Sequence, residues 1–147
     1  MRFVILAFLI FSACSSAPDA VEQQAREETF AESMQGVVLE GSFTITGRED
    51  RSVRNERYEI EKVVKLGGDI WTFHARIQYG DHDVTFPVPV KLLWAGDTPM
   101  VSLTDVSIPG LGTFTARVLF YRDHYAGTWW HGEVGGNQFG RIIRPGP

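Results

Sequence analysis

Apolar and polar residues alternate along most of this chain, and that alternation limits the possible folds more than any other feature. Between Thr113 and Tyr121, every second residue is apolar: Phe114, Ala116, Val118 and Phe120. Successive side chains of a β-strand point to opposite faces, so this spacing predicts a strand with one buried face. The same spacing recurs in segments separated by turns rich in glycine, proline and aspartate. We predict about eight strands from residue 36 onward.

Short connections between these segments predict an antiparallel meander. Closing such a meander into an up-and-down barrel removes the exposed edges that an open sheet would have; a β-sandwich is the alternative. A chain of 147 residues with 44% hydrophobic content suffices for one domain with a core, which we place at 36–147. The preceding 20–35 is rich in helix formers but has few apolar residues. We interpret it as a solvated spacer helix, with a partner-binding helix as the alternative.

Two prolines interrupt the predicted strand that runs from Val84 to Trp94. Pro87 and Pro89 lie two residues apart, so their missing N–H groups belong to the same edge of the strand. That edge cannot form a full hydrogen-bond ladder. We therefore place this strand at a sheet edge, or at a seam where the barrel closes imperfectly.

The N-terminus has the features of an export signal. Met1 and Arg2 precede the apolar run FVILAFLIF, which is too short to span a bilayer, and we predict a signal peptide at 1–13. The following Phe11-Ser-Ala-Cys14 resembles the lipobox of bacterial lipoproteins, with Phe11 where Leu, Val or Ile is usual. This resemblance implies lipidation of Cys14, the only cysteine, and a tether at 14–19. Ser15 after the cysteine implies the outer membrane; an ordinary secretory signal, with a secreted or periplasmic product, is the alternative.

The predicted arrangement of strands resembles the lipocalin and calycin group of small barrels. Gly127-Thr128-Trp129 matches the Gly-x-Trp motif of that group, although it lies in the next-to-last strand here and near the first strand in lipocalins. The resemblance implies a small barrel, and no binding residues are carried over from it. The run from Tyr125 to Gly132 also resembles the tails of uncharacterised bacterial secreted proteins and lipoproteins.

Aromatic residues dominate the faces that we expect to point inward. Aromatic walls with a few polar groups are typical of small-molecule pockets, although the same rings can fill a small barrel completely. Lys62 shares the expected inner face of its strand, where its ammonium group would reach water at the barrel mouth or meet an anionic ligand. The candidate ligand-binding residues are Lys62, Trp71, Phe73, Tyr79, Trp94, Tyr125, Trp129 and His131.

Histidines beside aspartates suggest a metal site as a further possibility. His82 and Asp83 lie in one predicted turn, and His124 lies in another. If both turns were at the same end of the barrel, these three residues could bind a divalent metal and support a hydrolase. The chain contains none of the HEXXH, Gly-x-Ser-x-Gly, P-loop or EF-hand motifs. We therefore predict a protein that is not an enzyme and has no cofactor.

Charge excludes one class of partner. The formal net charge is −4, and acidic and basic residues are mixed, so no basic stripe could neutralise nucleic-acid phosphates. We predict an envelope lipoprotein that binds a small apolar or amphipathic ligand in its barrel. The alternative is a protein-interaction module, an inhibitor or envelope scaffold that uses the Pro87/Pro89 edge or the charged loop at 47–56.

Overall fold

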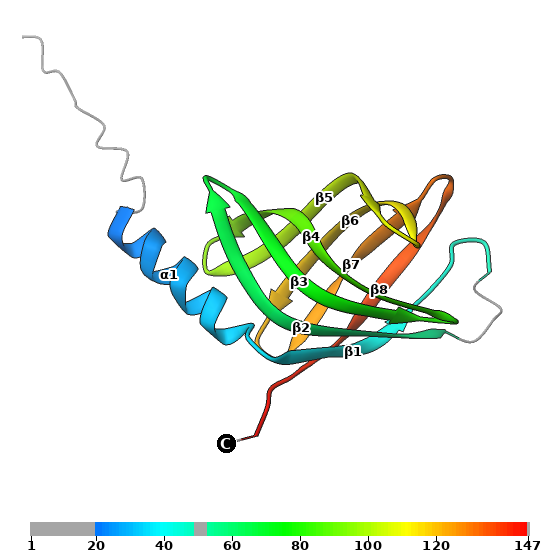
Figure 1. Cartoon of the computed structure of the whole chain (residues 1–147), viewed down its shortest axis with the longest axis horizontal. Coiled ribbons are helices and arrows are strands. Elements are labelled where there is room, and N and C mark those ends of the chain that lie inside the picture. Colours follow the sequence, from blue (N-terminus) through cyan, green and yellow to red (C-terminus); the bar gives the residue numbers. More distant parts are fainter. Residues whose placement is uncertain (1–19, 49–52, 147) are drawn as a thin grey trace, which may run out of the picture.

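The computed structural model describes residues 20–48 and 53–146, which form one helix and an eight-stranded antiparallel barrel (Figure 1). Each strand pairs with the next along the chain, and β8 pairs with β1 to close the barrel. The predicted meander and barrel are confirmed. The elements are α1 (Ala20–Ser33), β1 (Val37–Phe43), β2 (Arg54–Gly67), β3 (Ile70–Tyr79), β4 (His82–Ala95), β5 (Thr98–Ile108), β6 (Gly112–Tyr121), β7 (His124–His131) and β8 (Val134–Ile143).

Because neighbouring strands run in opposite directions, successive turns fall at alternate ends of the barrel. The turns β2–β3, β4–β5 and β6–β7 lie at the end beside α1, which we call the helix end (Figure 1). The connections β1–β2, β3–β4, β5–β6 and β7–β8 lie at the other end, which we call the distal end. This alternation decides which turn residues can meet.

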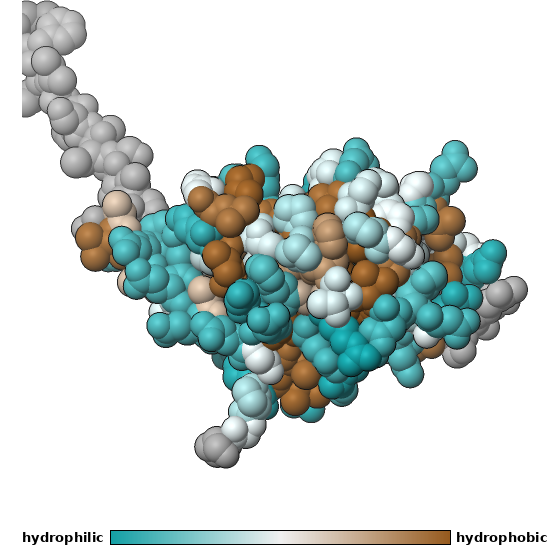
Figure 2. All heavy atoms as spheres, viewed as in Figure 1, coloured by the Kyte–Doolittle hydropathy of each residue, from teal (hydrophilic) through white to brown (hydrophobic). Residues whose placement is uncertain are grey.

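Helix α1 packs onto the helix end and contributes to the core. Phe30 is 7% exposed and Met34, just after the helix, is 1% exposed. The Phe30 ring makes edge contacts with Trp71 and Trp94 at centroid distances of 6.2 and 5.9 Å. Glu27 accepts a hydrogen bond from the Lys65 ammonium group. The predicted helix is confirmed, and one side of it is buried against the barrel while its outward side is mostly hydrophilic (Figure 2).

The phase of alternation in β2 changes partway along the strand. Its pairing with β3 shifts register between Ile60 and Lys62, because Glu61 forms a bulge that adds one residue to this strand. Beyond the bulge, Val63 faces inward and is 5% exposed, whereas Val64 is 37% exposed. The expected inward position of Lys62 is therefore wrong. The bulge places the Lys62 side chain on the outer surface, with its Nζ 4.0 Å from Oε1 of Glu61.

The ladder between β4 and β5 is short. β4 pairs with β3 along nearly its whole length, but only Lys91–Ala95 pairs with β5. The N–H of Leu92 donates to the backbone carbonyl of Asp69, on the β3 side of the strand. Backbone N–H groups of a strand point alternately to its two neighbours, so the nitrogens of Pro87 and Pro89, at odd-numbered positions, point toward β5. The prediction of an imperfectly closed seam is confirmed. We call this unpaired part of the β4–β5 boundary the seam.

Removing the Phe30 ring should destabilise the whole barrel. We expect Phe30→Ala to lower the free energy of unfolding by about 3–5 kcal/mol, because it leaves a cavity among packed aromatic rings. The exposed Glu32→Ala on the same helix is the matched control and should change it by less than about 0.5 kcal/mol. Urea unfolding followed by tryptophan fluorescence measures both. Equal stability of the two variants would show that α1 is not part of the cooperative core.

Candidate functional site

The barrel interior contains a cavity of about 190 Å³. All eight strands contribute to its wall, mostly through apolar side chains. Phe73 and Phe120 line the cavity, and both also contact Phe30 at centroid distances of 6.3 and 6.2 Å. The helix end is thus filled by aromatic packing, and the cavity occupies the space beyond it.

One polar cluster interrupts the apolar wall, and we call it the Glu56 cluster: Glu56, Tyr58, Tyr125 and Gln138. Glu56 is 5% exposed. Its Oε1 accepts a hydrogen bond from the Tyr125 hydroxyl at 2.8 Å, and its Oε2 accepts one from the Tyr58 hydroxyl, also at 2.8 Å. The Tyr58 hydroxyl also lies 3.4 Å from Gln138 Oε1. A carboxylate inside the barrel is therefore held by two phenolic donors.

The register of four strands explains how Tyr125 reaches Glu56. Tyr125 pairs with Gly140, Gly140 pairs with Gly41, and Gly41 pairs with Glu56. A Cβ on Gly41 would lie 2.4 Å from the Tyr125 hydroxyl, and a Cβ on Gly140 would lie 2.7 Å from the Tyr125 ring. The two glycines thus leave the space that the tyrosine side chain occupies between β7 and β2.

Burial controls the ionisation of this cluster. Desolvation raises the pKa of Glu56, and the hydrogen bonds from Tyr125 and Tyr58 partly oppose that rise. The pKa values of Tyr58 and Tyr125 are raised chiefly by desolvation and then by the nearby Glu56 charge. Both phenols therefore remain protonated and act as donors at neutral pH, while Glu56 acts as the acceptor.

An aromatic wall lies on the distal side of the cluster. Tyr79 pairs with Glu56 across the β2–β3 ladder. The Phe43 ring makes edge contacts with Tyr79 and with Trp129 at centroid distances of 6.2 and 5.5 Å. The indole Nε1 of Trp129 is buried and has no hydrogen-bond partner in the protein.

The structure divides the predicted ligand-binding residues into two groups. Phe73, Tyr79, Tyr125 and Trp129 line the cavity, and a role in ligand binding stays a prediction for them. The other four lie elsewhere. Trp71 and Trp94 pack against α1, His131 lies exposed at the distal rim with its ring 4.7 Å from that of Phe114, and Lys62 is on the outer surface.

The metal hypothesis fails on geometry. His82 and Asp83 begin β4 at the distal end, whereas His124 begins β7 at the helix end, so the two turns lie at opposite ends of the barrel. Asp83 instead accepts two hydrogen bonds from the Arg76 guanidinium, at 2.8 and 2.6 Å, and these lower its pKa. Within residues 20–48 and 53–146, no group of three His, Cys, Asp or Glu residues is arranged to hold a metal.

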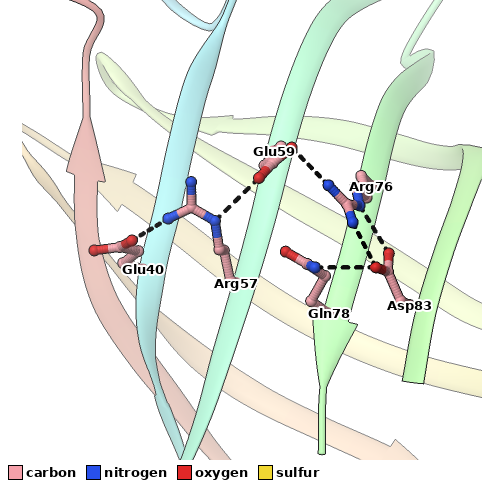
Figure 3. A network of polar contacts seen from close by, with 6 residues as sticks. All are labelled: Glu40, Arg57, Glu59, Arg76, Gln78 and Asp83. Atoms are coloured by element: carbon pink, nitrogen blue, oxygen red, sulfur yellow. Dashed lines mark hydrogen bonds and ion pairs between the residues drawn. The ribbon is translucent and has the colours of Figure 1, made fainter. Parts of the chain in front are cut away.

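The Arg76–Asp83 pair belongs to a chain of charges across the outer face of β1 to β4 (Figure 3). Arg57 bridges Glu40 and Glu59, and Glu59 lies 3.7 Å from Arg76. Figure 2 shows this region as a hydrophilic surface below the centre of the view. These groups are solvent-exposed and their charges are satisfied by one another, so they form no candidate site.

Sequence reasoning missed Glu56, Gln138 and the two glycines. Glu56 was assigned to the charged loop, but β2 begins earlier, at Arg54. One signal could have identified it: Glu56 lies two residues before Tyr58, so alternation places both on one face. Nothing local shows that Tyr125 lies beside Glu56, because that contact depends on the pairing of β7, β8, β1 and β2.

Comparisons with known proteins add no family to this description. No family model, no curated protein and no solved structure matches the chain. Among the described residues, no helix combines the length and apolar character needed to cross a membrane.

The raised pKa of Glu56 makes a prediction about stability. Protonation of Glu56 favours the folded state, and this contribution is complete below the ordinary pKa of 4.5 and is lost as pH rises through the raised pKa. Because the Glu56→Gln variant cannot ionise there, we expect its stability relative to wild type to increase between about pH 4 and about pH 8. Urea unfolding at both pH values measures the difference. A difference that does not change with pH would contradict the prediction.

Proposed function

We propose that this protein binds a small apolar or amphipathic molecule inside its barrel and is not an enzyme. The observation that supports the proposal is the cavity of about 190 Å³, walled by apolar side chains around one polar cluster. Ligand pockets in proteins have this composition, in which apolar surface supplies affinity and a few polar groups fix orientation.

The size of the cavity indicates a small ligand. An engineered apolar cavity of about 150 Å³ in another protein binds benzene, so this interior has room for one ring with a short substituent. An unfilled cavity also costs stability through lost packing contacts. A ligand that restores those contacts would stabilise the folded state.

For the location, we propose a bacterial envelope lipoprotein with a lipocalin-like barrel, anchored through Cys14 and directed to the outer membrane. The support is the lipobox-like sequence at 11–14, after the apolar run. Cys14 and the predicted signal peptide lie outside the described residues. Two ester-linked chains and an N-acyl chain would supply enough apolar length for stable anchoring.

A protein-binding function is the second candidate, and one surface favours it. Leu119 and Phe139 are exposed on the outer face of the barrel, and both pair with Ala126 between them. They form an apolar row across β6, β7 and β8. The Pro87/Pro89 edge is less suitable, because a strand added there would find two donors missing. The loop at 47–56 lies partly outside the described residues.

Filling part of the cavity should weaken ligand binding. Toluene is a suitable probe, with binding measured by methyl chemical-shift changes in NMR spectra. We expect Ala116→Leu, which adds carbon atoms to the cavity wall, to weaken binding by about tenfold or more. Ala126→Leu is the matched control, because Ala126 is exposed on the outer face, and should leave binding unchanged. Toluene shifts that are equal in both variants would place the bound molecule outside the cavity.

The anchor can be tested separately. We expect Cys14→Ser to move the protein from the membrane fraction to the soluble fraction, because the substitution removes the acceptor for lipid. The barrel should remain folded, since its strands run from Val37 to Ile143. Cell fractionation with immunodetection measures the distribution, and circular dichroism checks the fold. A Cys14→Ser protein that stays in the membrane fraction would overturn the lipoprotein assignment.

A further inference from the structure

We propose that the Glu56 cluster binds the ammonium group of a small amphipathic amine whose apolar part fills the cavity. This inference rests on the proposed function and narrows it to one chemical class of ligand. Its support lies in the charge balance of the cavity, in the arrangement of acceptor atoms and in the aromatic wall.

Among the residues that the structure describes, Glu56 has no cationic partner. Its two hydrogen bonds come from neutral phenols, and no lysine, arginine or histidine within 20–48 and 53–146 bonds to it. Arg57, the next residue, points to the outer face and bonds to Glu40 and Glu59. Burying a carboxylate without an opposite charge is costly. A bound cation would supply the charge that the protein itself does not place there.

The cluster presents acceptor atoms that remain available. An ionised carboxylate has about four acceptor positions, and Tyr125 and Tyr58 occupy one on each oxygen of Glu56. Gln138 Oε1 and the phenolic oxygens add further acceptors within the same cluster. An ammonium group has three donors and no acceptor, so it matches this set. A carboxylate or phosphate ligand would place a second negative charge against Glu56.

The walls beside the cluster favour the same class of ligand. Tyr79, Phe43 and Trp129 form adjoining aromatic surfaces near Glu56. Aromatic faces attract cations, and the attraction strengthens when the cation leaves water. The rest of the wall is apolar and requires an apolar remainder of the ligand. Together these features indicate one ammonium group on a short linker to a ring or a branched alkyl group.

Three probes of one shape and different charge test this inference: 2-phenylethylamine, 2-phenylethanol and phenylacetate. Isothermal titration calorimetry with the purified protein near neutral pH measures each affinity. We expect the amine to bind at least about tenfold more tightly than the alcohol, because its hydrogen bonds to Glu56 are charge-assisted. Phenylacetate should bind most weakly.

Substitutions test whether Glu56 is the source of the preference for the amine. Glu56→Gln should lower the affinity for the amine by about tenfold and change that for the alcohol by less than about twofold. Glu61→Gln removes an exposed carboxylate from the same strand and should leave both affinities unchanged. Tyr125→Phe keeps the Glu56 charge and should retain the preference for the amine. If Glu56→Gln does not fold, equal affinity of wild type for the amine and the alcohol still overturns the inference.

The outcomes separate this inference from the proposed function. Equal affinity of wild type for the amine and the alcohol would overturn the amine assignment and leave a neutral-ligand barrel. A preference for the amine that survives Glu56→Gln would also overturn it, because the preference would then arise elsewhere. Failure of all three probes, together with failure of toluene, would overturn both proposals.

Discussion

The pairing of β1 with β8 is the interaction on which the rest of the structure depends. It joins the first and last strands of the meander, and without it the sheet would be open and its apolar face exposed to water. Gly41 and Gly140 face each other within this ladder. Because neither has a side chain, the strands that close the barrel also leave room for Tyr125 to cross toward Glu56. Closure of the fold and assembly of the polar cluster therefore depend on the same few residues.

The two ends of the barrel differ in what covers them. At the helix end, Phe30 inserts among aromatic rings from β3, β4 and β6, and one ion pair, between Glu27 and Lys65, links α1 to β2. No helix covers the distal end among the described residues. The interior is thus a space with a packed base, and its polar cluster lies on one wall.

Alternation of residues was sufficient to predict the barrel and the inner faces of β3, β4 and β6. It failed in β2, where a bulge at Glu61 exchanges the two faces. The sequence there offers two adjacent valines, Val63 and Val64, so either phase places an apolar residue inward. The small number of apolar residues at 20–35 also led us to underestimate how much α1 contributes to the core. Phe30 and Met34 lie one helical turn apart and form only a narrow apolar stripe, yet both are buried at the helix end of the barrel.

The sequence predicted the aromatic lining of the candidate site but not its polar cluster. Aromatic residues on inner faces could be recognised strand by strand, and Phe73, Tyr79, Tyr125 and Trp129 do line the cavity. The Glu56 cluster could not, because it is formed by residues from β2, β7 and β8 that meet only once the register is set. The metal hypothesis also depended on how the strands are arranged. Successive turns lie at alternate ends of the barrel, and this separates His82 and Asp83 from His124.

The seam between β4 and β5 determines how rigid the cavity is. Elsewhere around the barrel, the distance between strands is fixed by backbone hydrogen bonds, which have one spacing. Along Pro87 and Pro89 that restraint is missing, and the partly buried side chains of Val84, Phe86 and Leu103 on these two strands pack against the core. Van der Waals contacts tolerate small displacements at a lower cost than a broken ladder does. The seam is therefore the part of the β4–β5 boundary where a change in strand separation breaks the fewest backbone hydrogen bonds.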